Sequence, residues 1–217
     1  MQYQEYMLDA QEQIKQRIVE TAYQMFLQNG IESVKMTDVA KQAEVGVASV
    51  YRYFGTKRAI VIRSGELFWN NVAAYVDHCV QTPSYCAATG LKKAHMLLEI
   101  ALRAYCEKRE FLLFLHRFDA FLLNEKASHA ELTSYENSIL QLREVARRAF
   151  DDGALDGSIR ADLDFDAFYF TATHALLSLG QKLVCGGDVL QSDRMIDGAQ
   201  QITMLIDMMM EYVKARK

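Results

Sequence analysis

One short stretch of this sequence gathers the residue types that bind phosphate groups and base edges. Between residues 35 and 63, six lysines and arginines stand against two acidic residues, whereas the whole chain of 217 residues has a net charge of −4. A basic island in an acidic chain is typical of a nucleic-acid-binding face. On charge alone, a solvated basic surface without a function is the alternative. The six basic residues are Lys35, Lys41, Arg52, Lys57, Arg58 and Arg63.

Two short predicted helices position these side chains. The first has Val39 and Ala40 facing inward, and Thr37 is placed to cap its start. After a break at residues 44–46, the second helix covers residues 47–54. Two short helices joined by such a turn make a helix-turn-helix, whose second helix enters the major groove of DNA. A module used only for packing or for binding protein is the alternative.

A longer helix is predicted on each side of this pair. Apolar residues from Ile14 to Phe26 recur at three- and four-residue steps, and Gly30 stands where a left-handed C-terminal cap falls. Gly55 ends the second short helix, and Thr56 caps the next one, which begins with Lys57. Backbone amides at a helix N-terminus next to a lysine form a phosphate site.

Residues 14–57 resemble the N-terminal domain of the tetracycline-repressor (TetR) family. The matching residues are Ala22, Phe26 and Gly30, the run Thr37 to Ala40, Val45 in the turn, and Tyr51, Phe54 and Lys57. The resemblance implies a DNA-binding domain over residues 1–57 and an effector-binding and dimerisation domain over residues 58–217. It implies that phosphates are contacted by Thr37, Tyr51 and Lys57, and that the groove is faced by Val47, Ala48, Ser49, Arg52 and Tyr53.

Two positions depart from the usual pattern of that family. The family usually has glycine where Glu44 stands and a polar cap where Gly46 stands. A residue other than glycine in a left-handed turn costs on the order of 1 kcal/mol, which the fold tolerates. The second short helix is also poor in long hydrogen-bonding side chains. Base reading is therefore expected from Arg52, from Ser49, from apolar contacts with thymine methyl groups, and from DNA shape.

The rest of the chain is predicted to be a larger all-helical domain. Proline occurs once, at Pro83, and apolar residues follow a helical period. Helices are predicted over residues 56–79, 91–107, 110–125, 129–152, 165–184 and 193–215, which makes about nine in all. The breaks between them are marked by Pro83 and Ser84, the Ser128 and Glu131 capping box, a loop flanked by Gly153 and Gly157, and Gly186 with Gly187.

The last two predicted helices are apolar on more than one face, which is too much for packing against one neighbour. The sequence therefore predicts a second partner surface. The resemblance implies that the partner is a twin, in a homodimer with these helices at a four-helix interface. Two DNA-binding domains about 34 Å apart read a palindromic operator in double-stranded DNA. A place for these helices in the central core is the alternative.

Frequent aromatic side chains in the larger domain predict a cavity for a small, mostly apolar effector. Aromatic residues at helical spacing also form ordinary core, and a lone histidine is often only hydrogen-bonded in place. The candidate ligand contacts are Tyr105, Phe114, Phe118, Tyr135, Phe168 and His174. The sequence does not choose among a drug, a fatty acyl compound, a flavonoid and a metabolite.

The function expected from these features is that of a transcriptional regulator, a repressor that a small-molecule effector releases from its operator. Effector-independent DNA binding is one alternative, and a small-molecule-binding protein that has lost DNA binding is another. No enzyme is expected, because no catalytic motif occurs. The aspartates at 162, 164 and 166 fit helix capping better than calcium binding, and the cysteines lack zinc-ligand spacing. No metal and no cofactor are therefore expected.

The N-terminal residues lack the pattern of a signal peptide. No segment approaches the roughly 18 consecutive apolar residues that a membrane span needs. A cytoplasmic protein without a membrane partner is therefore expected.

Overall fold

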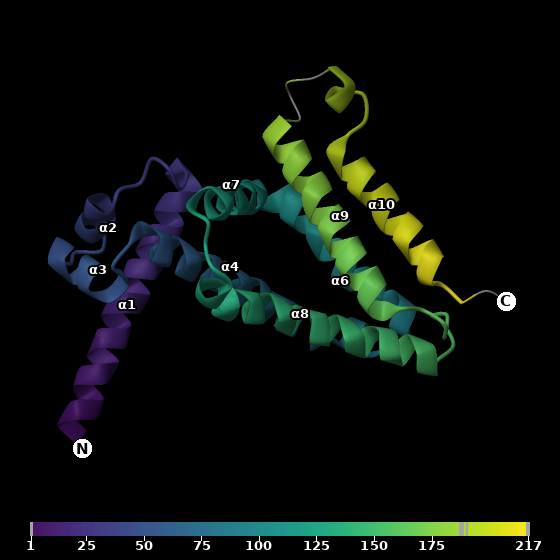
Figure 1. The fold of residues 1–217 in the computed structure, drawn as a ribbon. Coiled ribbons are helices and arrows are strands. Elements are labelled where there is room, and N and C mark those ends of the chain that lie inside the picture. Colours follow the sequence, from purple (N-terminus) through teal and green to yellow (C-terminus); the bar gives the residue numbers. More distant parts are fainter. Residues whose placement is uncertain (1, 187–188, 190, 216–217) are drawn as a thin grey trace. The chain divides into compact units, whose positions relative to one another are not determined.

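The computed structural model describes residues 2–186, 189 and 191–215. Within these residues the regular secondary structure consists of ten α-helices and one 3₁₀ helix, η1 (Figure 1), which confirms the predicted all-α fold. The chain divides into two compact units. The first comprises Met1–Asn71 and Phe114–Ser138, and the second comprises Val72–Leu113 and Ile139–Lys217.

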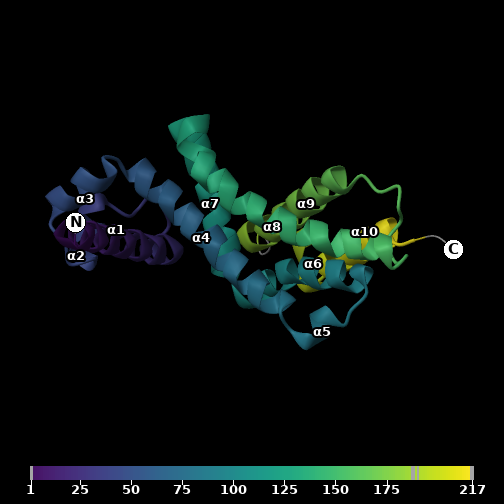
Figure 2. The ribbon, with the colours of Figure 1, turned by 90° about the horizontal axis from the view of Figure 1, so that it is seen from below.

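Four helices make up the N-terminal part of the first unit. Ile18, Ala22 and Phe26 form the buried stripe of α1 that the sequence predicts, and α2 packs against both α1 and α3 (Figure 2). The helices are α1 (Gln2–Asn29), α2 (Met36–Gln42), α3 (Val47–Phe54) and α4 (Lys57–Val80), of which α4 contributes its residues up to Asn71 to this unit.

The later part of the first unit comes from α7 (Arg109–Glu125) and α8 (His129–Leu155) and carries an aromatic core. The ring of Phe114 lies 5.3 Å from the ring of Tyr23, and the rings of Phe118 and Tyr135 lie 4.9 Å apart. A Cβ atom added at Gly65 of α4 would lie 2.6 Å from the ring of Phe118. Only glycine therefore leaves room for this ring against α4.

The second unit is a helical core with α10 packed against α6 and α9. Phe168 and Leu176 of α9 and Ile202 and Ile206 of α10 are buried in it. α5 lies beside α6 (Figure 2). The helices that enter the unit after α4 are α5 (Pro83–Cys86), α6 (Gly90–Glu107), the first residues of α7, the later residues of α8, α9 (Phe165–Gly186), η1 (Gln191–Arg194) and α10 (Gly198–Val213).

The start of α2 differs from the prediction. The N-cap is Lys35, so Thr37 lies inside the first turn instead of capping the helix. The carboxylate of Asp38 accepts a hydrogen bond of 3.2 Å from the Lys35 backbone N–H. An acidic residue in the first turn also interacts favourably with the helix dipole. Asp38 thus stabilises the N-terminus of α2, which needs no hydroxyl cap.

Pro83 begins a helix, whereas the sequence had predicted that Pro83 and Ser84 end one. α4 ends before it, at Val80, and Pro83 is the first residue of the short helix α5, which the sequence did not predict. The hydroxyl of Thr82 accepts a hydrogen bond of 3.4 Å from the Tyr85 N–H as the cap. Proline is favourable in a first turn because its φ is already helical and its missing N–H would have no partner there.

Two other boundaries were predicted wrongly. Gly153 lies within α8 instead of at the edge of a loop, and the absence of a side chain at Gly90 of α6 lets that residue approach the Gly153 backbone closely. Asp193 belongs to η1, and α10 begins only at Gly198, with Asp197 as its cap. The predicted break at Gly186 coincides with the end of α9, and Gly187 lies outside the described residues.

Candidate nucleic-acid interface

The turn between α2 and α3 has the tight geometry of a helix-turn-helix. Glu44 has a φ of 54°, which is the left-handed conformation expected at this position. The Val45 N–H donates a hydrogen bond of 3.0 Å to the Ala40 carbonyl, which closes the turn. Gly46 caps α3 through its backbone, because its carbonyl accepts a hydrogen bond of 2.9 Å from the Ser49 N–H. The polar side-chain cap that is usual in the TetR family is therefore not needed.

One side of α3 is fixed in the core and the opposite side faces solvent. Val50 is fully buried, with an exposed fraction of 0%, whereas Tyr51 is 50% exposed. This contrast orients the helix, since rotation about its axis would expose Val50. The predicted DNA-contacting residues all have solvent-accessible surface: Thr37, Val47, Ala48, Tyr51 and Arg52 are exposed, and Ser49, Tyr53 and Lys57 are partly buried.

Arg52 and Tyr53 contact each other on the surface of α3. The guanidinium Nη2 of Arg52 donates a hydrogen bond of 2.8 Å to the Tyr53 hydroxyl, and its Cζ lies 4.7 Å from the centroid of the Tyr53 ring. Lys15 of α1 approaches the same ring, with its Nζ 5.8 Å from the centroid. Lys15 was missed by sequence reasoning, because it belongs to no motif and only the fold brings α1 to this ring.

The N-terminus of α4 follows α3 directly. The Thr56 hydroxyl accepts a hydrogen bond of 3.2 Å from the Ala59 N–H, which confirms the predicted cap. Lys57 donates a hydrogen bond of 3.1 Å from Nζ to the Glu32 carbonyl. Partial burial lowers the pKa of Lys57, and the charges of Glu32 and Glu125 act in the opposite direction. Lys57 is therefore held next to amide groups at a helix start, which is the arrangement that favours a bound phosphate.

Arg58, the next residue, is engaged within the first unit. Its Nε and Nη2 lie 2.9 Å and 2.7 Å from the Glu131 carboxylate, and its Nη1 donates a hydrogen bond of 3.2 Å to the Glu125 carbonyl. Glu131 also accepts a hydrogen bond of 3.0 Å from the Ser128 N–H, as the predicted capping box requires. Arg58 thus ties the start of α4 to the turn between α7 and α8.

The six predicted ligand contacts are divided between the two units. Phe114, Phe118 and Tyr135 belong to the aromatic core of the first unit, and Phe118 has an exposed fraction of 0%. The second unit contains the other three: Tyr105 is partly buried on α6, Phe168 is buried on α9, and His174 is exposed on α9. The assignment of these residues to a ligand stays a prediction.

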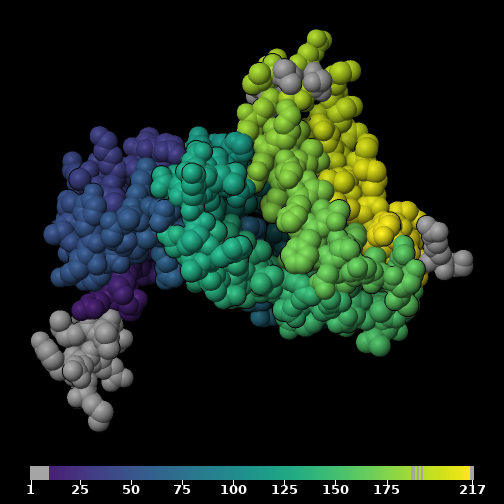
Figure 3. All heavy atoms as spheres, in the orientation of Figure 1, coloured from purple at the N-terminus to yellow at the C-terminus, as the bar shows by residue number. Residues whose placement is uncertain are grey.

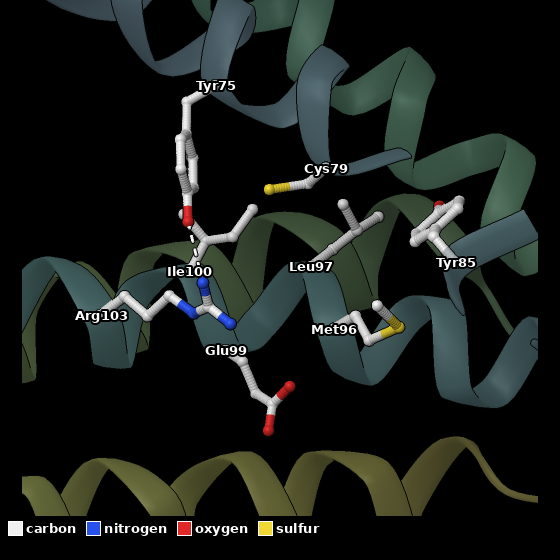
Figure 4. A pocket seen from close by; sticks show the side chains of 8 residues that line it. All are labelled: Tyr75, Cys79, Tyr85, Met96, Leu97, Glu99, Ile100 and Arg103. Carbon is white, nitrogen blue, oxygen red and sulfur yellow. Dashed lines mark hydrogen bonds between the residues drawn. The ribbon is translucent and has the colours of Figure 1, made fainter. Parts of the chain in front are cut away.

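A small cavity of about 50 Å³ lies in the second unit between α4, α5 and α6 (Figure 4). Tyr75 and Cys79 point toward α6, and Arg103 donates a hydrogen bond of 3.1 Å to the Tyr75 hydroxyl. A ligand pocket usually measures about 300–1,000 Å³, so this cavity has the size for water rather than for an effector. Its lining residues are Tyr75, Cys79, Tyr85, Met96, Leu97, Glu99, Ile100 and Arg103.

The aspartates that could have suggested calcium have other roles. Asp164 accepts a hydrogen bond of 3.1 Å from the Ala167 N–H at the start of α9, and Asp162 pairs with Arg160 at 2.8 Å. Among the described residues, no cluster of three or more histidine, cysteine or acidic side chains has a geometry suited to a metal. None of the described helices is long and apolar enough to cross a membrane.

These features define a class of protein. A helix-turn-helix with an outward-facing second helix, in an all-helical chain with a larger second part, is the arrangement of a DNA-binding regulator. Residues 18–63 match the family model described as bacterial regulatory proteins, tetR family. The helix-turn-helix part of the chain thus matches the tetR family of bacterial regulatory proteins, as the resemblance of its sequence indicated.

Solved structures of other regulators share the fold over nearly the whole chain. FadR from Bacillus subtilis, in complex with stearoyl-CoA, has a TM-score of 0.68 at 14% identity, covering 92% of this chain and 99% of its own. The ketosteroid regulator KstR2 of Mycobacterium tuberculosis has a TM-score of 0.59 at 20% identity, with 92% and 94% covered. FadR of Thermus thermophilus, in complex with lauroyl-CoA, has a TM-score of 0.64 at 15% identity, with 93% and 96% covered. No curated protein sequence matches the chain.

Proposed function

We propose that this protein represses transcription by binding a palindromic operator as a homodimer, and that a small, mostly apolar effector releases it. The observation that carries the proposal is the orientation of α3. Burial of Val50 turns Val47, Ala48 and Arg52 outward on the helix that enters the major groove in such proteins. A regulator of the chromosome with this function works in the cytoplasm.

In this proposal the phosphate contacts and the base contacts have separate residues. Thr37 on α2, Tyr51 on α3 and Lys57 at the start of α4 bind phosphates through a hydroxyl, a phenol and an ammonium group. Arg52 and Ser49 donate hydrogen bonds to base edges, and Val47 and Ala48 contact thymine methyl groups. Tyr53 lies on the same face of the motif.

The outward faces of α9 and α10 support the proposed homodimer. Met204, Met208 and Tyr212 follow one another at four-residue steps on α10, so they form one stripe on the helix. Each is more than half exposed, at 54%, 58% and 58%. On α9, Phe170 is also exposed, and the two helices lie side by side (Figure 3). An apolar stripe of this kind is favourable when a second copy covers it.

The larger helical domain and the solved structures with a similar fold support a small, mostly apolar effector. The two FadR structures contain stearoyl-CoA and lauroyl-CoA, which have long apolar chains. The candidate contacts in this chain remain Tyr105, Phe114, Phe118, Tyr135, Phe168 and His174. An effector weakens DNA binding if it prefers the form of the dimer in which the separation of the two DNA-binding domains fits the operator less well. DNA then weakens effector binding by the same factor.

Selection of operator sites from random duplex DNA tests the proposal. The full-length protein should enrich a palindrome, and its affinity should fall steeply with salt. Failure to enrich any sequence, with the protein folded and dimeric, would favour a small-molecule-binding protein that has lost DNA binding. Enrichment without release by any compound in an effector screen would favour effector-independent DNA binding.

A Lys57→Ala variant tests the phosphate contacts. One lost phosphate contact in each copy of a dimer flattens the log–log salt slope by about 1.8, so between roughly 50 and 200 mM salt the variant should lose about twelve-fold less affinity than the parent. Base preference should stay the same. Lys92→Ala, at an exposed position in the second unit, is the matched control and should keep the parental slope. Equal slopes for both variants would contradict the role of Lys57.

A further inference from the structure

The side chain of Arg52 contacts the neighbouring side chain on α3 in two ways. Its Nη2 donates a hydrogen bond of 2.8 Å to the Tyr53 hydroxyl, and its guanidinium carbon lies 4.7 Å from the Tyr53 ring centroid. Arginine in solution samples many rotamers, and binding normally has to select one of them. A guanidinium that is stacked and hydrogen-bonded beforehand loses less freedom when it meets a base pair.

The Tyr53 ring has a contact from outside its own helix. Nζ of Lys15, on α1, lies 5.8 Å from its centroid, within the range of a cation–π interaction. The ammonium group of Lys15 also pairs with Glu12 at 2.7 Å, one turn earlier on α1. The ring that holds Arg52 is therefore approached by a side chain of the α1 scaffold, and Tyr53 is partly buried whereas Arg52 is exposed.

We propose that Tyr53 is a positioning residue, which presets Arg52 for a base edge while Lys15 steadies the Tyr53 ring. The proposal rests on the DNA-binding function proposed above and concerns how that function achieves specificity. Guanidinium has several N–H donors in a planar fork, so one bond to Tyr53 leaves a pair of donors for O6 and N7 of guanine. The ligand of this cluster is thus a guanine in the major groove, read by Arg52.

The alternative is that the Tyr53 hydroxyl contacts DNA directly. The two roles differ in their dependence on Arg52. A direct contact persists when Arg52 is removed, whereas a positioning effect disappears with the side chain that it positions. A double-mutant cycle separates the two cases, because neighbouring residues that act as one unit give non-additive effects.

The experiment uses the full-length protein and the operator that it selects. Arg52→Ala first identifies the base pair at which preference is lost. Tyr53→Phe, which removes only the hydroxyl, should then reduce discrimination at this same base pair by about five-fold, the size of one typical hydrogen bond. The salt slope should not change, because no phosphate contact is lost. In the Arg52→Ala background, Tyr53→Phe should cause no further change.

Two results would overturn the proposal. Tyr53→Phe with full discrimination would show that the hydroxyl does not position Arg52. An equal loss in the presence and in the absence of Arg52 would show that Tyr53 contacts DNA itself. Tyr51→Phe is the matched control on the same helix: it should weaken binding to all sequences alike and leave base preference unchanged. Unchanged thermal unfolding of Tyr53→Phe excludes a folding defect as the cause.

Lys15→Met tests the contribution of α1, because methionine keeps an apolar stem and removes the charge. Discrimination at the Arg52 base pair should fall by about two-fold, the size of an exposed cation–π interaction. A change in salt slope with unchanged base preference would mean that Lys15 binds a phosphate and does not steady the ring. The parent protein distinguishes these results from failure of the proposed function, since without DNA-binding activity it selects no operator at all.

Discussion

The buried pair formed by Trp69 and Tyr135 allows a quantitative test of the first unit. Trp69 Nε1 donates a hydrogen bond of 3.0 Å to the Tyr135 hydroxyl, and both side chains are buried. Replacing Tyr135 with phenylalanine keeps the ring against Phe118 and removes the acceptor. The indole N–H is then left without a partner in the interior, which has a larger cost than loss of an exposed hydrogen bond.

The expected loss in the free energy of unfolding is about 1–3 kcal/mol, the cost of an unsatisfied buried donor. For a chain of this size, each kcal/mol lowers Tm by about 2–4 °C. Trp69 is the one tryptophan of the sequence, so its fluorescence during urea unfolding reports on the environment of this bond. Tyr75→Phe is the control, because its hydroxyl accepts from the exposed Arg103 and its removal should cost less than about 0.5 kcal/mol.

The same variant has a predicted dependence on pH. Burial raises the pKa of Tyr135 to about 12, above its ordinary value of 10.0. The neutral phenol is thus favoured in the folded protein, and its contribution to stability is present below pH 10 and lost as pH rises toward about 12. Between pH 10 and about 12, the free energy of unfolding should therefore fall less for Tyr135→Phe than for the parent. Urea unfolding at a series of pH values measures this difference.

Unchanged stability of Tyr135→Phe at pH 7 would refute this reasoning, because it would mean that Trp69 finds another acceptor or that the bond contributes nothing. The result also bears on the prediction that Tyr135 contacts an effector. A variant with parental stability and a weakened response to an effector would support the ligand role. A destabilised variant with normal effector affinity would leave Tyr135 with a structural role alone.

Three further substitutions test other parts of the molecule. Gly90→Ala would place a methyl group against the backbone of Gly153, so thermal unfolding should show a loss of about 1–3 kcal/mol or more; an unchanged Tm would contradict the close approach of α6 and α8. The pKa of Glu131 is lowered by hydrogen bonds from Ser128, so its stabilisation is present above pH 4.5 and lost as pH falls. Glu131→Gln should be less stable than the parent at pH 7, and the difference should shrink as the pH falls. A difference in the free energy of unfolding that is the same at every pH would refute this role of the Glu131 charge. Met208→Asp places a charge in the exposed stripe of α10 and should shift sedimentation from dimer to monomer; an intact dimer would exclude this face as the interface.

Features that depend on neighbouring residues could be predicted from the sequence. Gly30 and Gly55 have φ values of 81° and 69°, as expected for helix ends, and Thr56 caps α4. Glu44 has the left-handed conformation that the comparison with a family pattern required. In each case the residue itself and a few neighbours determine the backbone, so a single sequence contains the necessary information.

Features that depend on packing could not be predicted in this way. Aromatic residues at helical spacing have the same pattern whether they line a cavity or fill a core. The contact of Phe118 with Gly65 that distinguishes these cases lies between helices remote in sequence. Lys15 is a similar case, because its nearness to Tyr53 arises from the packing of α2 against both α1 and α3. Thr37 was predicted two residues after the actual cap of α2, Lys35, because the bond from Lys35 to Asp38 was not weighed. Pro83 was assigned to a helix end instead of a helix start because the cap at Thr82 was not weighed.

The predicted boundary between residues 57 and 58 separates the proposed DNA contacts from the rest of the chain and stays a prediction; the two compact units divide the chain elsewhere, after Asn71, Leu113 and Ser138. The proposed DNA contacts all lie between residues 37 and 57 of the first unit. The core of the same unit also includes Phe114, Phe118 and Tyr135, which come much later in the sequence. α7 and α8 each contribute residues to both units. A change in the conformation of α7 or α8 within the first unit would therefore alter the core around Phe114, Phe118 and Tyr135, since close-packed cores transmit small displacements. Under the proposed function, an effector that favours one conformation of these helices changes the affinity for DNA.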